Sequence, residues 1–408
     1  MVKPFLLVFL PLIATFAYAS EERFYRIETL PTPQDVSFEV SGLDTLPDGR
    51  VAITLLEGEL WLLDDSGETP TYKKTAEALH EPLGVLWHND SYYVSQRGEL
   101  SRLIDCDGDD VIDEYRTITE DWGLTGNYHE YAYGPKLDLN GKLWITLNQT
   151  IGKKIEKDNR WRGWGVTVDE DGNLTPECCG MRSPCGLGTN ATGEMFFTDQ
   201  QGNWVPAGTL HQLKRGAFYG HTDSLEHCDR EGSPMKKPEK VEANIPIPEA
   251  KEKNPFLSLP AVWFPYRKAG MSATDIACDT TGGAFGPFQD QMFVGDFTEA
   301  KIHRVFLEKV RSEYQGACFP FRSGFQSAVV RMTWGKDGCL YVGETNRGWN
   351  SIGTASYGLQ KVSWNGETPF EIKEMRTKPN GFLLTFTQPL DPASAGNPES
   401  YRMSSYTY

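Results

Sequence analysis

An acidic stretch from Asp105 to Glu114 offers the clearest set of metal-ligating side chains in this sequence. It reads DCDGDDVIDE, with carboxylates at alternate positions around a glycine. Oxygen ligands in this pattern, with a glycine for the sharp turn, can wrap a short loop around one calcium ion. The expected ligands are the side chains of Asp105, Asp107 and Asp109, the carbonyl of Val111, and Asp113 or Glu114.

This stretch differs from a full EF-hand, because Arg116 stands at the position where that motif has its final glutamate. The alternative is a solvated acidic hairpin tip. Crowded carboxylates would repel one another without a cation, so we favour a structural calcium site.

His129 is the residue best suited to act as a general base. It lies in the run Tyr128 to Tyr131, shortly before the turn at Gly134-Pro135. An imidazole can take a proton near neutral pH. One histidine among seven is more often a hydrogen-bonded structural residue, so position alone does not assign the role.

Three further motifs follow His129 along the chain. They are Arg182-Ser183-Pro184-Cys185-Gly186-Leu187, Asp199-Gln200-Gln201-Gly202 and Phe218-Tyr219-Gly220. In type and order these motifs resemble the glucose/sorbosone dehydrogenases, over roughly Gly42 to Trp364. The residues of these motifs are still more similar to those of large exported proteins of planctomycete-like bacteria. In those proteins such a propeller precedes β-domains and haem-binding modules.

The resemblance implies a six-bladed β-propeller that uses pyrroloquinoline quinone (PQQ) with calcium. It implies that His129 accepts the proton of a sugar hydroxyl while a hydride passes to the quinone. It also implies that Arg182 pairs with charged groups of the cofactor, and that carbonyls near Gln201 and Gly202 hold its calcium. The expected cofactor-binding residues are Arg182, Ser183, Gln201, Gly202 and Arg347.

Three positions depart from the family pattern. Ser183 stands where the family has asparagine, Thr298-Glu299 where it has lysine, and Asn203 where it has proline. These changes alter three expected cofactor contacts and leave open a different ligand for the same site. Arg347, beside Trp349, is expected either in a sugar-facing loop or in a rim turn whose indole packs on its neighbour.

The elements that must position these residues recur six times. Each copy is a polar turn followed by a strand of aromatic and β-branched residues, which suits tight hairpins and half-buried strands. Most copies lie one blade length apart, about 40–50 residues. The copies lie at 47–54, 89–95, 140–146, 192–198, 290–295 and 337–343.

We therefore predict an all-β fold, with a six-bladed β-propeller over residues 20–366. Residues 226–258, rich in Lys, Glu and Pro, are expected to form a long surface loop inserted into a blade, with a lost seventh repeat as the alternative. Residues 367–408 are expected to begin a small β-sandwich-like domain that is truncated.

Residues 1–19 have the layout of a secretory signal peptide. Lys3 precedes the apolar run Phe5 to Phe16, and Ala17-Tyr18-Ala19 forms a cleavage site. We expect a periplasmic or secreted protein with no membrane span; the alternative is an uncleaved anchor. The net charge of −16 argues against nucleic acid as a partner.

The eight cysteines are expected to form structural disulfides, because exported proteins oxidise their thiols. The adjacent Cys178 and Cys179 are expected to bond to separate partners. The pairing cannot be read from the sequence.

Three functions are compatible with these residues. The first is a PQQ-dependent sugar or alcohol dehydrogenase, with a haem group as a possible electron acceptor. The second is a calcium-dependent lactonase-type hydrolase, which would recruit Asp44, Asp199, Asp275 and Asp296. The third is a non-catalytic propeller that binds carbohydrate or protein.

Overall fold

The computed structural model describes residues 21–152, 159–202 and 204–408. The predicted signal peptide, residues 1–19, lies outside the described residues. Within the described part of the chain, no helix combines the length and the apolar character needed to cross a membrane.

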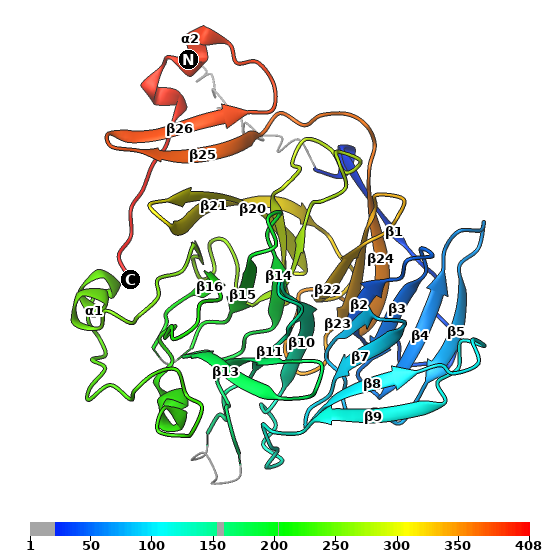
Figure 1. Ribbon diagram of the computed structural model, residues 1–408. Helices are drawn as coiled ribbons and strands as arrows, with labels where there is room; N and C mark the ends of the chain where they lie inside the picture. The colour runs from blue at the N-terminus through cyan, green and yellow to red at the C-terminus, as the bar shows by residue number, and fades with distance from the viewer. Residues whose placement is uncertain (1–20, 153–158, 203) are drawn as a thin grey trace, which may run out of the picture.

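Six four-stranded antiparallel sheets form a ring of six blades (Figure 1). The first three blades are β2 (Val40–Thr45), β3 (Val51–Leu55), β4 (Glu59–Asp64) and β5 (Thr71–Ala76); β6 (Val85–His88), β7 (Ser91–Ser95), β8 (Leu100–Ile104) and β9 (Glu114–Thr119); and β10 (Ala132–Leu137), β11 (Leu143–Leu147), β12 (Trp164–Val168) and β13 (Leu174–Cys179).

The fourth and fifth blades are β14 (Gly186–Thr189), β15 (Met195–Asp199), β16 (Gly208–Gln212) and β17 (Val262–Phe264); and β18 (Ala273–Cys278), β19 (Met292–Asp296), β20 (Lys301–Val310) and β21 (Glu313–Ser323). The sixth is β22 (Val329–Trp334), β23 (Leu340–Thr345), β24 (Tyr357–Trp364) and the N-terminal β1 (Tyr25–Thr29). The predicted six-bladed propeller is confirmed.

The first strand of each blade lies at the axis, since β2, β6, β10, β14, β18 and β22 contact one another in a closed circle. Each predicted turn-and-strand repeat supplies the second strand of one blade: β3, β7, β11, β15, β19 and β23. The hairpin turns between first and second strands all lie on one face of the ring. The connections from second to third strand, and from one blade to the next, lie on the other face.

Glycine allows neighbouring blades to approach closely at the axis. A Cβ atom at Gly84 would lie 2.1 Å from the carbonyl oxygen of Gly134, and one at Gly186 would lie 2.0 Å from that of Thr274. No larger residue fits at either point without moving backbone.

Buried hydroxyl groups join successive blades. A Ser or Thr in the second strand donates a hydrogen bond to a carbonyl oxygen of the next blade or the segment just before it: Ser95 to Ala132 (3.1 Å), Thr146 to Pro184 (2.8 Å) and Thr198 to Thr274 (2.7 Å). These bonds satisfy hydroxyl groups that water does not reach.

The ring is closed by β1, which pairs with β24 from Tyr25↔Trp364 to Thr29↔Gln360. The predicted insertion, residues 226–258, is confirmed: it lies within the connection between β16 and β17, which contains η2 (Thr222–His227) and α1 (Ile247–Lys253). A short η1 (Glu21–Arg23) precedes β1.

After the last blade the chain forms the hairpin β25 (Ile372–Lys378) and β26 (Gly381–Phe386), followed by α2 (Pro392–Ala395) and η3 (Pro398–Ser400). The hairpin lies beside the outer strands of the fifth blade (Figure 1). Arg304 donates to the carbonyl of Ile372 at 2.7 Å, and the Thr377 N–H donates to Glu308 at 2.8 Å. The expected truncated domain stays a prediction.

Candidate functional site

A cavity of about 280 Å³ opens at the axis, on the face formed by the blade-to-blade connections and the loops between second and third strands. Its lining includes five residues singled out from the sequence: His129, Arg182, Ser183, Gln201 and Arg347. They come from four connections separated by up to 218 positions along the chain. The structure therefore brings the expected catalytic and cofactor-binding residues together in one axial funnel.

His129 is half-buried in the funnel wall. Its backbone N–H donates to the Oδ1 atom of Asn127 at 3.0 Å, and its ring makes an edge contact with Tyr128. Burial, together with the guanidinium groups of Arg182 and Arg97, lowers the pKa of His129. The imidazole is therefore neutral at physiological pH, which is the state that can accept a proton.

Arg182 presents its guanidinium to the funnel without an ion-pair partner among the described residues. It packs against the loop at Gly202, where an added Cβ would lie 2.2 Å from the Cδ atom of Arg182 and 2.7 Å from the ring of His221. Gly202 is thus a neighbour of the funnel residues, and only a glycine permits this approach.

Asp199, at the end of β15, holds the backbone that carries Arg182. Its carboxylate accepts hydrogen bonds from the N–H groups of Arg182 (2.8 Å), Ser183 (2.7 Å) and Gln200 (2.8 Å). Burial raises the pKa of Asp199 to about 6, although these three donors lower it. The Nε2 atom of His221 lies 3.8 Å from the Asp199 carboxylate.

The supporting role of Asp199 was not deduced from the sequence, although the residue opens the Asp-Gln-x-Gly motif. The same device recurs one blade later. Asp296, at the end of β19, accepts hydrogen bonds from the N–H groups of Met271 (2.7 Å) and Ser272 (3.0 Å), which also line the funnel. A carboxylate at the end of a second strand therefore fixes the connection that enters the same blade.

Among the described lining residues, two buried side-chain atoms have no hydrogen-bond partner: the Oδ1 atom of Asn148 and the hydroxyl of Thr298. Asn148 is only 1% exposed, and its amide nitrogen donates to the Ser183 hydroxyl at 3.3 Å. Buried polar atoms are almost always paired, so these two fit contacts to a bound molecule.

Arg347 lies at the mouth, where its charge is shared with acidic residues. Its Nη1 atom lies 2.8 Å from Glu39 and 3.7 Å from Glu57. Among the described residues, no cation–π contact joins Arg347 to Trp349; the indole is 63% exposed and lines the mouth with Tyr128. Both the sugar-facing loop and the rim turn stay predictions for this segment.

Arg182 is the arginine of the funnel that has no ion-pair partner among the described residues. Arg347 faces three carboxylates, those of Glu39, Glu57 and Glu81. An anionic group in the funnel would therefore be stabilised chiefly beside Arg182.

Arg331 closes the funnel from below. Its guanidinium donates to the carbonyl oxygens of Ser41 (2.9 Å), Leu83 (2.8 Å) and Cys185 (3.3 Å), and it stacks over Tyr133 at 5.4 Å. A second, much smaller cavity lies beyond it and shares Leu83 and Cys185 with the funnel. The residue was not singled out from the sequence, where it lies within a run of strand residues.

The four aspartates considered for a lactonase-type centre do not meet in the funnel. None of Asp44, Asp199, Asp275 and Asp296 belongs to its lining. Each is engaged by backbone N–H groups, as in the bonds from Trp87 to Asp44 and from Met332 to Asp275. They are structural carboxylates in this fold.

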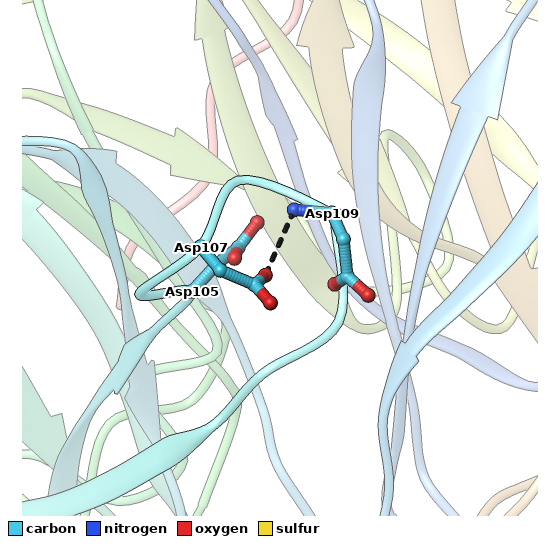
Figure 2. Close-up of side chains that lie close together, drawn as sticks. All are labelled: Asp105, Asp107 and Asp109. Carbon is cyan, nitrogen blue, oxygen red and sulfur yellow. Dashed lines mark hydrogen bonds between the residues drawn. The ribbon is translucent and has the colours of Figure 1, made fainter.

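The acidic loop lies between β8 and β9, on the face of the ring opposite the funnel mouth. The carboxylates of Asp105, Asp107 and Asp109 lie within 4.8 Å of one another and are partly or fully exposed (Figure 2). Asp105 accepts hydrogen bonds from the N–H groups of Gly108 and Asp110. The structure thus groups three of the expected ligands.

The other expected side-chain ligands, Asp113 and Glu114, lie outside this group. Asp113 accepts a hydrogen bond from the N–H of Cys106, and Glu114 pairs with Arg116. The N–H of Val111 donates to Asp109 at 2.8 Å. Because loop and funnel lie on opposite faces, an ion in the loop cannot touch a molecule in the funnel.

The expectation of disulfides is wrong for this structure, in which all eight cysteines are free. Five are buried between packed strands and loops, where a cysteine behaves as a small apolar residue. Cys178 and Cys179 face different neighbours, Tyr219 and Cys228, as expected for adjacent residues in a strand.

Solved structures with a similar fold include three sugar dehydrogenases. A putative oxidoreductase (glucose dehydrogenase) from Thermus thermophilus is 16% identical, with a TM-score of 0.62 over 83% of this chain and 99% of that one. The PQQ-bound aldose sugar dehydrogenase from Streptomyces coelicolor is 14% identical, with a TM-score of 0.60 over 83% and 98%. The apo aldose sugar dehydrogenase from Escherichia coli is 16% identical, with a TM-score of 0.61 over 84% and 100%.

At these identities the likeness establishes a shared propeller fold. No curated protein matches the sequence. A family match covers residues 23–318, which include the funnel residues up to Thr298. The chain belongs to the family described as Domain of unknown function (DUF7133).

Proposed function

We propose that this protein is an exported oxidoreductase that binds PQQ in its funnel and oxidises a hydroxyl-bearing carbon of a sugar or related alcohol. The observation that carries the proposal is the pairing, across one cavity, of a neutral His129 with an Arg182 that has no ion-pair partner among the described residues. The sugar dehydrogenases of the same fold support it. A non-catalytic carbohydrate-binding propeller is the alternative.

The lining fits an anionic, planar cofactor by its donor chemistry. Arg182 offers a planar guanidinium for carboxylate groups. The partnerless Thr298 hydroxyl and Asn148 oxygen offer two further polar contacts. The cofactor's calcium would be held by carbonyls near Gln201 and Gly202.

The bound quinone would supply a two-electron acceptor for hydride. The imidazole of His129 would take the proton of the substrate hydroxyl as the carbon–hydrogen bond breaks. Asp199 keeps the Arg182 backbone in place through its three hydrogen bonds, so the guanidinium stays oriented. Arg331 excludes water from below, and Trp349 and Tyr128 give the mouth two exposed aromatic faces for a sugar ring.

The test uses the full chain, purified without its leader and reconstituted with calcium and PQQ. The expected results are a bound-cofactor absorption spectrum and reduction of an artificial electron acceptor with at least one member of a sugar and alcohol panel. A haem protein would replace the dye in the natural reaction. Saturable sugar binding without dye reduction would instead establish the non-catalytic alternative, and absence of bound PQQ would overturn the proposal.

A further inference from the structure

Three sulfur atoms from three segments meet at the outer edge of the third blade, away from the funnel. Cys179 is the last residue of β13 and is fully buried. Its Sγ atom lies 3.3 Å from the Sδ atom of Met235. Its thiol is also hydrogen-bonded to that of Cys228, the residue that follows η2. Cys228 and Met235 both belong to the insertion between β16 and β17.

The ligand types in this sulfur cluster select for a soft cation. Among the described residues, the one group of three or more His, Cys, Asp or Glu side chains placed to hold a metal is the Asp105 loop. The sulfur cluster therefore lacks a third ligand of the kind that zinc prefers. Two thiols with a thioether are the donor set that favours Cu(I) over harder ions.

The position of the cluster allows an ion to enter. Cys228 is 4% exposed and Met235 is half-buried, so the cluster lies just below the surface. Binding of Cu(I) by two thiols releases two protons and leaves one net negative charge on the site.

We propose that Cys179, Cys228 and Met235 form a Cu(I) site that fastens the insertion to the third blade. The copper stays in one oxidation state, so no oxidant or reductant is consumed. The site is independent of the funnel, and its test does not depend on any dehydrogenase activity.

The experiment is an anaerobic titration of the full, reduced chain with Cu(I) in competition with a coloured Cu(I) chelator. The expected result is one equivalent of copper withheld from the chelator. Cu(I) should also protect two of the eight thiols from alkylation. Met235→Leu, which keeps an apolar side chain of similar size, should weaken binding by roughly tenfold or more.

Cys228→Ser should abolish copper retention, whereas Cys339→Ser, at a partly exposed cysteine outside the cluster, should leave it unchanged. If Cys228→Ser does not fold, the alkylation pattern and Met235→Leu still decide the matter. The proposal is overturned if no copper is withheld, if Cys339→Ser loses copper as Cys228→Ser does, or if the natively isolated protein has six free thiols because Cys179 and Cys228 form a disulfide.

Discussion

The guanidinium group of Arg331 crosses the axis of the propeller and donates a hydrogen bond of 2.8 Å to the carbonyl oxygen of Leu83. Arg331 comes from the sixth blade and Leu83 from the entry to the second. The same side chain reaches Ser41 and Cys185, so one residue ties four parts of the ring together. Its side chain is almost entirely buried, and its partners are backbone carbonyl oxygens and the Sγ atom of Cys185, which water does not reach.

Arg331→Met should lower the free energy of unfolding by roughly 3–5 kcal/mol, because three buried carbonyl groups lose a charged donor. Arg331→Lys should recover only part of this loss, since one ammonium cannot reach all three carbonyls. Urea denaturation gives the measurement. As a control, Arg116→Met removes an exposed arginine paired with Glu114 and should change stability by about 0.5 kcal/mol or less. Equal effects of the two Met substitutions would contradict the role of Arg331.

His129→Ala should reduce dehydrogenase activity of the reconstituted protein by about 10²–10⁴-fold, with cofactor binding retained. His80→Ala, at an exposed histidine, serves as the matched control. Because burial and two guanidinium groups lower the pKa of His129, the neutral base persists below the ordinary histidine range. The pH profile of kcat/KM should stay flat to below about pH 6.5 and then fall. An unchanged rate in His129→Ala would refute the base assignment.

Asp199→Asn should weaken binding of an anionic funnel ligand by roughly tenfold, because the amide can no longer accept all three backbone N–H groups that position Arg182. Asp296→Asn makes the same change one blade later, where the supported residues are Met271 and Ser272. The two variants should lose similar stability, while only Asp199→Asn raises the Kd of the ligand. Equal changes in Kd would show that the effect is structural and unrelated to Arg182.

Asp105→Ala combined with Asp107→Ala should abolish calcium binding at the β8–β9 loop, as measured by equilibrium dialysis. Since this loop lies opposite the funnel mouth, the Kd of a funnel ligand should not change. Glu120→Ala with Asp121→Ala removes two acidic residues elsewhere on the surface and should leave calcium binding intact. Retention of the ion by the first double variant would show that the acidic loop is only a solvated hairpin.

Glu344→Gln should make stability less dependent on pH. Burial raises the pKa of Glu344 to about 9, so the folded protein holds a proton that the unfolded chain releases near pH 4.5. The raised pKa therefore stabilises the folded state at low pH, and this contribution is lost as pH rises from 4.5 to 9, by about 1.4 kcal/mol per pH unit.

Glutamine resembles the protonated side chain and cannot ionise. The variant should therefore lose the contribution of about 1.4 kcal/mol per pH unit to the slope of unfolding free energy against pH. Urea denaturation at several pH values measures it. Glu313→Gln, at an exposed glutamate, is the control and should retain the parent slope.

The repeated turns predicted the propeller well because each is a local event. An Asp-Gly or Asn-Gly pair precedes the second strand of a blade at Asp48-Gly49, Asn140-Gly141 and Asp337-Gly338. The closing strand β1 has no such signal. It is defined by its pairing with β24, more than 330 positions away, and its own residues do not reveal that partner.

The candidate site likewise contains some residues that the sequence reveals and others that it does not. His129 and Arg182 could be found from the sequence because their residue types suggest chemistry and their neighbours form motifs. Arg331 could not, because an arginine between Val330 and Met332 gives no sign that its side chain reaches across the axis. The disulfides were predicted wrongly because cysteine count and export say nothing about which sulfur atoms face each other.

The position of Arg331 also determines how molecules can enter and leave the funnel. With the floor blocked, whatever enters the funnel must leave through the mouth between Tyr128 and Trp349. One molecule must therefore leave through the mouth before the next can enter. For the proposed dehydrogenase, an electron-accepting partner would dock on this same side of the ring, and the opposite side would stay free for other contacts.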